Sequence, residues 1–468
     1  MIEQISFSKN ETIDERETTT LEIGIYDVHL PCRQYRINFK VAELGKVSLT
    51  TEFLLRLIHA IDGMYETDVA QFFGFSAPEM TYLLNEAVSL GYINRESGRL
   101  WLTRAGNELF VQDNDYPQIF NVEENTLDCG FDLISFAYQD KNHYEIFDPD
   151  VYELAIDQKI ASKGTKQVLN SFKNNFREIT SQYRLNSELN KSLYSIDNVS
   201  PGNRFTTVIP ITVKAEKVSP SRGEPDLSKW RSEDELESRQ KIMPAIAKFM
   251  EELHISLPRD AKEQYLFLYT LAPELMRDYL SNDCISVERF FSKTVDLKKR
   301  GFSNNRNTIP IAGSLFNMNN VDRLLEGVSQ KITHASEESI PNTLYWLAPY
   351  NRHWGRTCVL PKLLGKISVL LSSKFDDENQ KVSTTLLRHC KFRAPDKVFD
   401  KVEQFERNEL PKNLEILLIP GICVAVLIHL PIHSTYGHAV PLGFISIAPK
   451  IISNAEEKLK IIKSVPSS

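Results

Sequence analysis

The chain of 468 residues is too long for a single hydrophobic core, so about two to four domains are expected. Apolar residues make up 42% of it and charged residues 25%, which is ordinary for a water-soluble globular protein. The net charge of -7 excludes a uniformly basic coat, so any contact with nucleic acid has to come from local basic patches.

The first stretch, MIEQISFSKNETIDERETTT, is polar and acidic and lacks the apolar run of a signal peptide. The longest apolar stretch, LEILLIPGICVAVLIHLPIH, is interrupted by Pro420, Gly421 and Pro431 and predicts two buried strands rather than a membrane span. The cysteines are far apart and form no Cys-x-x-Cys pair, which predicts reduced thiols and no zinc site. We therefore expect a cytoplasmic protein with no membrane partner, no bound metal and no cofactor.

The N-terminal part of the chain shows a clear order of elements. Residues 1–47 contain the strand-like runs TTLEIGIYDVHL and YRINFKVAEL and are expected to form a small β element that leans on the next segment. In residues 48–112, an amphipathic helix (TTEFLLRLIHAIDG) precedes a shorter one (ETDVAQFFGF) and a sharp turn at Gly74. A third helix, capped by Ser76, and two strands around the tip Glu96–Gly98 complete the segment.

This order resembles the winged helix-turn-helix family, whose members usually bind DNA. In that family the second helix of the turn lies in the major groove, and the hairpin, or wing, reaches the neighbouring backbone. The corresponding helix here is expected to bury Leu83, Leu84, Ala87, Val88 and Leu90. Its outward face is expected to carry Glu79, Met80, Tyr82, Asn85, Glu86 and Ser89. Two carboxylates and no cation on that face are unfavourable beside phosphates.

The wing is the more basic part of this segment, because Arg95, Arg99 and Arg104 flank its tip. Two hypotheses stay open: a nucleic-acid contact led by the wing, or a protein-interaction module that touches no DNA. One further candidate for phosphate contact is a predicted helix that carries Lys159, Lys163, Lys166, Lys173 and Arg177. The other is a loop-like segment with Lys298, Lys299, Arg300 and Arg306.

Beyond residue 112 the pattern predicts four more regions, so the expected fold class is α+β and multidomain. Residues 113–214 mix strand-like and helical sequence, and residues 215–231, rich in proline, serine and charge, predict a linker. Residues 232–310 have apolar residues at three-four spacing and predict helices. Residues 311–468 alternate between helix and strand, with a strand expected at ISVLLSS (367–373) after a helix at TCVLPKLLGK.

In the last region, the helix LLEGVSQKITHA precedes the strand NTLYWLAPYN, which ends near a proline. His389, Lys391 and Asp396 have the spacing His-x-Lys-x(4)-Asp, and His429 and Gly443 lie on the final pair of predicted strands. This layout resembles the phospholipase-D-like nuclease superfamily. The resemblance implies that a histidine attacks phosphorus and that the lysine stabilises the phosphate charge.

The match to that superfamily is incomplete. Pro395 and charged sequence surround the first motif, and Pro431 stands where the second would need its lysine. Two alternatives stay open: the fold has lost its site, or His389 and Lys391 reach the site by another route.

Two further clusters were considered as binding sites. An aromatic and basic group at the C-terminal end of a predicted strand, where ligands often bind in open α/β sheets, is the preferred site for a phosphate or a nucleic-acid strand. It consists of Trp346, Tyr350, Arg352, His353, Trp354 and Arg356, and its alternative role is packing against the next domain. His429, His433 and His438 lie close together, but without acidic or thiol ligands nearby they predict structural histidines.

The leading hypothesis is a DNA-associated accessory component of a bacterial multi-protein system that acts on foreign DNA, antiphage defence included. It would bind DNA largely without sequence specificity and work with other protein subunits. The first alternative is a phospholipase-D-like nuclease that uses His389 and Lys391. The second is a scaffold that recruits a partner and makes no DNA contact. No Walker loop, GxGxxG or GxSxG motif is present, so ATPase, dinucleotide-dependent and serine-hydrolase functions are set aside.

Overall fold

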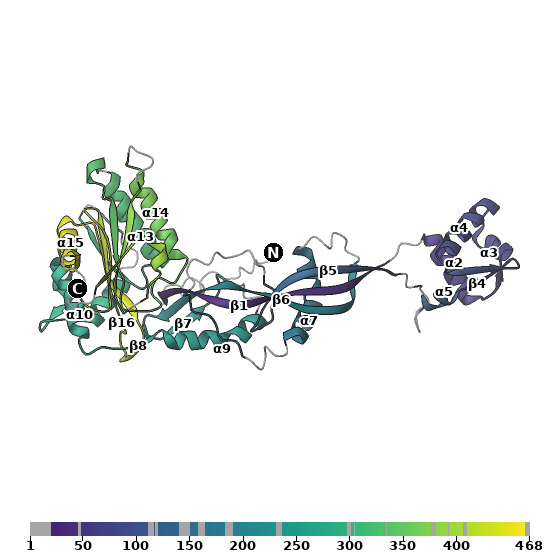
Figure 1. Cartoon of the computed structure of the whole chain (residues 1–468), viewed down its shortest axis with the longest axis horizontal. Coiled ribbons are helices and arrows are strands. Elements are labelled where there is room, and N and C mark those ends of the chain that lie inside the picture. Colours follow the sequence, from purple (N-terminus) through teal and green to yellow (C-terminus); the bar gives the residue numbers. More distant parts are fainter. Residues whose placement is uncertain are drawn as a thin grey trace, which may run out of the picture.

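The computed structural model describes a mixed α/β chain with several sheets. Figure 1 shows three parts along the long axis: a small head (residues 48–110), a long β-sheet arm with α9 (Leu236–Glu252) beside it, and a larger α/β body (residues 254–463). The structure describes residues 20–44, 48–110, 117, 120–139, 150–157, 164–182, 191–230, 236–296, 301–303, 305–333, 335–375, 381–391, 393–405 and 410–463 of the chain.

The arm is a four-stranded antiparallel sheet built on one very long strand. Its order is β5-β1-β6-β7, with β1 (Thr20–Leu44) in the centre between β5 (Phe120–Asp132) and β6 (Lys191–Glu216). Strands of this length exceed the usual ~5–6 residues, and register shifts along the β1–β6 pair accommodate the twist. Helices α7 (Gly164–Asn174) and α8 (Phe176–Gln182) cover one face of the sheet.

The N-terminal strand differs from the expectation for residues 1–47. It is the central strand of the arm rather than a small β element that supports the head. Leu44 at the end of β1 pairs with Phe120 at the start of β5, so the head is inserted between two paired strands. Residues 1–19 and 45–47 lie outside the described part of the chain.

The linker prediction for residues 215–231 is wrong. Strand β7 (Gly223–Asp226) pairs with β6, and Leu227 belongs to the main hydrophobic core. Proline and charge suggested an open segment, but short edge strands carry both because only one side of their backbone must be paired.

The head contains the three predicted helices and two predicted strands in the predicted order: α2 (Leu49–Ala60), α3 (Glu66–Phe73), α4 (Ala77–Ser89), β3 (Ile93–Glu96) and β4 (Arg99–Leu102). The short strand β2 (Met64–Tyr65) and the short helix α5 (Arg104–Glu108) were not predicted. Gly74 ends α3 with φ of 70°, and the Glu79 carboxylate accepts hydrogen bonds from the backbone N–H and the hydroxyl of Ser76.

The expected burial of α4 is wrong at three positions. Met80 is buried although it was expected to face outward, and Val88 and Leu90 are 44% and 46% exposed. Leu54 and Leu55 of α2 share one buried cluster with Met80, Leu83 and Leu84 of α4, whereas Val88 and Leu90 lie outside that cluster. The neighbouring helix, rather than the periodicity, therefore determines which stripe is buried.

The body is a seven-stranded mixed sheet with helices on both faces. Its order is β11-β18-β16-β15-β12-β13-β14, with parallel pairing at β12–β13 and β13–β14. Helices α13 and α14 pack on one face, and α10 and α15 pack on the other (Figure 1). The strands of the sheet are β11 (Thr308–Ala312), β12 (Thr343–Leu347), β13 (Ser383–His389), β14 (Lys401–Phe405), β15 (Leu414–Ile419), β16 (Cys423–Leu430) and β18 (Val440–Ser446).

Helices α9 (Leu236–Glu252), α10 (Ala261–Leu271), α11 (Pro273–Met276), α12 (Val287–Asp296) and α13 (Met318–Thr333) lie in predicted helical segments. Helix α14 (Val359–Ser372) continues past its predicted end, and α15 (Pro449–Lys463) was not predicted. Short strand pairs join β8 (His254–Ser256) to β17 (Tyr436–His438) and β9 (Leu280–Ser281) to β10 (Cys284–Ile285).

The strand predicted at residues 367–373 is wrong. Helix α14 continues through Ser372, and its buried residues follow helical spacing. Gly365 lies on the solvent face of α14, and no atom lies within 4 Å of the position that a Cβ atom would take there. The next strands, β13 and β14, lie in the charged sequence that follows, part of which was not expected to be regular.

The apolar run near the C-terminus forms β15 and β16, two fully buried neighbouring strands, which confirms the prediction of buried strands. Among the described helices, none combines the length and the apolar character that a membrane crossing would need.

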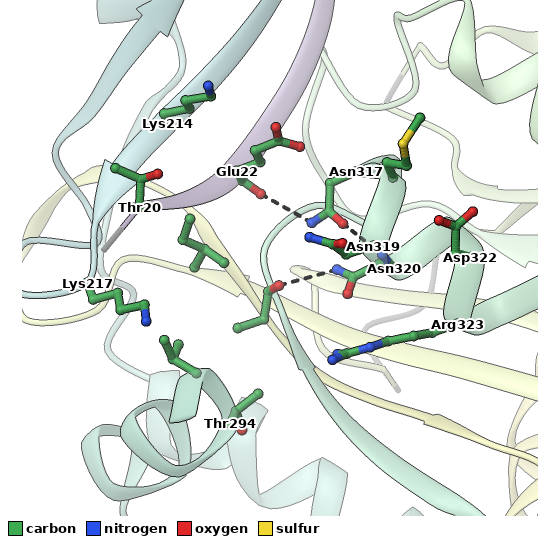
Figure 2. Close-up of a pocket in the computed structure, with 14 residues that line it drawn as sticks. Thr20, Glu22, Lys214, Lys217, Thr294, Asn317, Asn319, Asn320, Asp322 and Arg323 are labelled. Carbon is green, nitrogen blue, oxygen red and sulfur yellow. Dashed lines mark hydrogen bonds between the residues drawn. The ribbon is translucent and has the colours of Figure 1, made fainter. Parts of the chain in front are cut away.

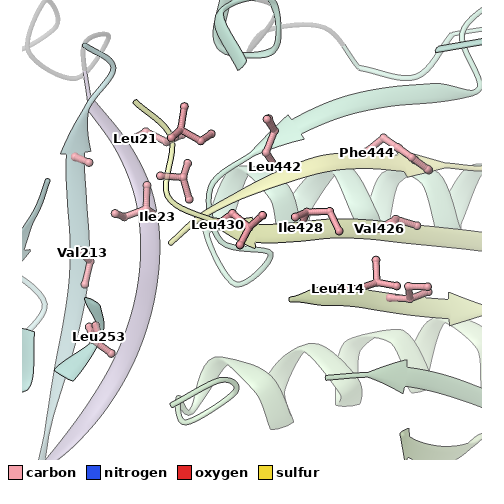
Figure 3. Close-up of a cluster of buried hydrophobic side chains, with 14 of the residues drawn as sticks. Leu21, Ile23, Val213, Leu253, Leu414, Val426, Ile428, Leu430, Leu442 and Phe444 are labelled. Atoms are coloured by element: carbon pink, nitrogen blue, oxygen red, sulfur yellow. The ribbon is translucent and has the colours of Figure 1, made fainter. Parts of the chain in front are cut away.

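One hydrophobic core joins the arm to the body. Figure 3 shows Leu21 and Ile23 of β1 and Val213 of β6 on the side that faces Leu430 and Leu442 of the body sheet. Each fully buried aliphatic side chain contributes about 1.5–3 kcal/mol. The base of the arm is therefore held by the same core that stabilises the body.

A substitution at Gly443 on β18 would measure how closely the strands of the body sheet are packed. A Cβ atom there would overlap the carbonyl oxygen of Val426, so Gly443→Ala should lower the free energy of unfolding by about 2 kcal/mol or more. The matched control is Gly365→Ala on the solvent face of α14, which should raise it by about 1 kcal/mol. Urea denaturation measures both, and equal effects from the two substitutions would contradict this packing.

Candidate functional site

The three wing arginines each have partners within the head. The Arg95 guanidinium forms an ion pair with Glu66, and Arg99 donates to the Tyr65 hydroxyl at 2.6 Å and lies over the Tyr65 ring. Arg104 pairs with Glu108 at 3.0 Å on α5. Such exposed contacts contribute at most about 1 kcal/mol each, so a phosphate could displace them. While they are formed, the carboxylates of Glu66 and Glu108 reduce the positive charge of the wing.

The basic segment near residue 300 is only partly described. Lys298, Lys299 and Arg300 lie outside the described residues, as do Lys159 and Lys163 of the other basic segment. Arg306 is half-buried, and its backbone forms a bridge with Ser303.

Most of the aromatic and basic cluster at the end of β12 is buried, namely Trp346, His353, Trp354 and Arg356, whereas Tyr350 and Arg352 are exposed. Arg352 forms an ion pair with Glu252 of α9 and donates from Nε to His353 Nε2 at 2.9 Å. Arg356 is buried and donates from Nε to the carbonyl oxygen of Arg352 at 2.8 Å. Burial, together with both guanidinium groups, lowers the pKa of His353 to about 4, so this ring is neutral at neutral pH.

A buried carboxylate, Glu415, organises the polar interior beneath that cluster. Its Oε1 accepts hydrogen bonds from the indole N–H groups of Trp346 and Trp354, each at 3.0 Å. Its Oε2 lies 2.7 Å from His429 Nε2. A buried carboxylate needs partners of this kind, and a single acidic residue inside the apolar strand LEILLI was the sequence signal for it.

The arm strand β1 covers this network. Tyr26 is partly buried, and its pKa rises to about 12 through the burial of its hydroxyl group and the nearby charge of Glu415. Asp27 accepts a hydrogen bond from the Cys358 backbone N–H at 2.6 Å, and its own N–H donates to the carbonyl oxygen of Arg356 at 2.8 Å. The structure thus places Glu415 and His429 under the arm rather than in an open cleft.

The residues of the His-x-Lys-x(4)-Asp match are not brought together. His389 ends β13, and its Nδ1 accepts a hydrogen bond from the Lys391 backbone N–H at 3.3 Å. Asp396 accepts two hydrogen bonds, at 2.9 and 2.8 Å, from the guanidinium of Arg388. The Lys391 side chain is exposed. The His-x-Lys-x(4)-Asp spacing arises because β13 ends at His389 and a short turn follows it. Asp396 pairs with the cation of Arg388 and not with that of Lys391.

The three histidines near the C-terminus have separate partners. His429 lies against Glu415, and His433 lies 3.6 Å from Glu288. His438 Nδ1 accepts from the Gly223 N–H at 3.2 Å and lies 3.1 Å from His254 Nε2. Within the described residues, no group of three or more potential ligands is arranged to hold a metal ion.

Two surface hollows lie apart from these clusters, and sequence patterns did not indicate either one. The first, of about 430 Å³, lies on the head between the start of α2 and α4. It is lined by Ser48, Thr50, Phe75, Pro78, Glu79, Tyr82, Leu83 and Glu86. The second, of about 460 Å³, lies where the arm meets the body.

Comparison with known proteins adds no family assignment: no family model matches the chain, and no curated protein shows significant similarity to it.

The Glu415 network should be the most sensitive polar element of the body. Glu415→Ala leaves two indole N–H groups and His429 without their acceptor and should cost about 3 kcal/mol or more. Glu415→Gln keeps one acceptor oxygen and should cost clearly less. Denaturation followed by tryptophan fluorescence measures both, and equal losses for the two variants would show that the network contributes little.

Asp27 should give the body a distinctive pH dependence. Burial raises the pKa of its carboxyl from 3.8 to about 6, so its ionisation lowers the stability of the fold as pH rises from about 4 to about 6. Asp27→Asn should therefore gain stability relative to wild type as pH rises from about 4 to 7, by about 3 kcal/mol at most. His353 and His438 act in the opposite sense, because their pKa values are lowered from 6.5 to about 4. Through them the folded protein loses stability as pH falls from about 6.5 to about 4.

The difference between Asp27→Asn and wild type removes the histidine contribution, because both proteins share it. Urea denaturation at a series of pH values measures this difference. A difference that does not change with pH would contradict the raised pKa of Asp27.

Proposed function

We propose that the chain is a non-catalytic adaptor whose head is a winged helix-turn-helix that binds a basic segment of a partner protein rather than DNA. The order α2–β2–α3–α4–β3–β4 supports the winged-helix assignment, since a helix-turn-helix followed by a hairpin is the pattern of that family. The proposal keeps the accessory role expected from the sequence and changes the ligand of the head.

The observation that carries the proposal is the acidic and apolar surface of α4. Residues 49–110 contain four arginines, no lysine and eight carboxylates, so the net charge of the head is -4 with His59 neutral. The carboxylates are Glu52, Asp62, Glu66, Asp68, Glu79, Glu86, Glu96 and Glu108. A domain that neutralises phosphates needs the opposite balance.

The hollow between α2 and α4 has the composition of a protein-docking groove. Phe75, Pro78 and Leu83 provide apolar walls, and Tyr82 at its edge is 76% exposed. Further apolar side chains on the head are also exposed, among them Phe72 at 66% and Leu49 at 68%. Exposed apolar residues gathered on one small domain favour a protein interface, in which aromatic residues act as anchors.

Charge complementarity indicates the chemistry of the partner. Hydrogen bonds from Ser76 lower the pKa of Glu79, and hydroxyl groups of Thr51 and Ser48 lower the pKa of Glu86. Both carboxylates therefore stay negative at the edge of an apolar groove. We infer an apolar segment flanked by lysine or arginine as the occupant.

The arm supports an adaptor role because it holds the head away from the body. The chain leaves the arm after Leu44 and returns at Phe120, so the head lies beyond the free end of paired strands (Figure 1). The opposite end of the arm shares the core of the body. A partner bound to the head would thus be tethered beyond the end of the arm opposite to anything bound to the body.

The body supports the non-catalytic part of the proposal. We take it as a phospholipase-D-like fold that has lost its site, because His429 lies against buried Glu415 under β1 and Pro431 replaces the expected lysine. Asp396 is bound to Arg388 instead of completing a site with His389 and Lys391.

Peptide binding tests the docking surface. The probe is a synthetic amphipathic helix with leucines on one face and lysines on the other, and its control is the same peptide with glutamates in place of the lysines. The full chain should bind the basic peptide only, and Tyr82→Ala should weaken that binding about tenfold without loss of stability. The matched control, Val369→Ala, removes an equally exposed apolar side chain from α14 of the body and should change nothing.

A duplex-DNA titration provides the opposing outcome. If the wing contacts phosphates, DNA affinity should fall steeply with salt, and the double substitution of Arg95 and Arg99 by alanine should reduce that slope. Salt-dependent binding lost in this double variant would contradict the proposal. Equal binding of the acidic and basic peptides would contradict the choice of partner.

A further inference from the structure

The hollow at the junction of the arm and the body is built from both parts. It has a volume of about 460 Å³, which is within the usual range for pockets that hold small molecules. Figure 2 shows its walls: the start of β1, the end of β6, α12 and the first turn of α13. The residues that line it include Thr20, Leu21, Lys217, Thr294, Asn319 and Arg323.

The walls of this pocket are held together by close backbone contacts. The carbonyl oxygen of Glu22 accepts hydrogen bonds from the Ser314 N–H at 3.0 Å and from Asn317 Nδ2 at 3.5 Å. Gly313 has φ of +84°, and a Cβ atom there would lie 2.5 Å from the same carbonyl oxygen. The loop after β11 therefore needs glycine to approach β1 so closely, and the pocket is a fixed feature of the fold.

Cationic side chains face the pocket from opposite sides. Figure 2 shows Lys217, just after β6, and Arg323, on α13, extending toward one another across the opening. Lys214 also lines the pocket, although it forms an ion pair with Asp226 at 2.7 Å. Glu22 and Asp322 are the acidic residues in the lining, and the Glu22 side chain points away from Lys217 in Figure 2.

The neutral groups of the lining suit an anion as well. The backbone N–H of Asn320 in the first turn of α13 donates to Asn317 Oδ1. The backbone N–H groups of Met318 and Asn319 in the same turn have no acceptor within the helix, as is general for a first turn, and such groups favour an anion. Partial burial lowers the pKa of Arg323, and the nearby carboxylate of Glu326 opposes this shift. Arg323 stays a cation at neutral pH, and its partly desolvated charge strengthens its attraction for an anionic ligand. Leu21, Val295 and Ala312 add an apolar wall.

We propose that this pocket binds a small phosphorylated molecule of about mononucleotide size, with its phosphate between Lys217 and Arg323 and its ring against Leu21 and Val295. Asn319 and the first turn of α13 would donate to the phosphate oxygens. Because the pocket joins the arm to the body, such a ligand would stabilise that junction. This inference is independent of the docking surface on the head, since the two sites share no residue.

Calorimetric titration and thermal unfolding of the full chain test the pocket. The ligands are inorganic phosphate, pyrophosphate, adenosine monophosphate and adenosine, each at equal ionic strength. Adenosine monophosphate should bind and raise the unfolding temperature, inorganic phosphate and pyrophosphate should bind more weakly, and adenosine should have no effect.

Variants assign the binding to the pocket. Lys217→Glu and Arg323→Ala should each weaken binding at least tenfold, whereas Arg222→Ala, an exposed cation in the nearby β6–β7 turn, should leave it unchanged. Because Arg323 is partly buried, Lys217→Glu provides the decisive result if Arg323→Ala unfolds. Binding that all three variants retain, binding of adenosine alone, or the absence of any phosphate-dependent binding would overturn the proposal.

Discussion

The packing of β1 against the body is the contact on which the rest of the architecture depends. The first half of this strand contributes Leu21, Ile23 and Val28 to the core of the body, and the second half contributes Ile37 and Phe39 to the core of the arm. A single strand can serve two cores only if it stays paired along its whole length, as it does with β6. This constraint makes the arm an extension of the body rather than a separate domain on a linker.

The same packing determines which polar groups can act. Tyr26 and Asp27 cover Glu415 and His429 at the edge of the sheet where related α/β folds bind ligands, so that edge is occupied by the chain itself. Farther along, the loop after β11 is buried, whereas Met318 and Asn319 at the start of α13 are exposed beside the pocket that Lys217 and Arg323 line. We therefore place phosphate binding in that pocket and not at the covered edge.

Local signals made the head predictable. Gly74, Ser76 and the apolar spacing of α2 and α4 act within a few residues of one another, so they reveal element order without knowledge of the fold. Contacts between elements were not predictable in this way. Met80 is buried and Val88 is exposed because of where α2 lies. Gly365 lies in the middle of α14 on its solvent face, where a helix tolerates glycine because no packing contact is lost. Residues 223–226 form a strand only because β6 offers them a free edge.

The candidate sites show the same division. By itself the sequence determined the acidic composition of the head, most of the helices between residues 236 and 333 and the buried pair of strands near the C-terminus, because composition and periodicity are properties of neighbouring residues. Only the tertiary structure decided that Arg352 pairs with Glu252, that Asp396 pairs with Arg388, and that Lys217 and Arg323 face one pocket. The physical reason is that charge and hydrogen bonding act over a few ångströms in space, and the fold brings together residues that are far apart along the chain.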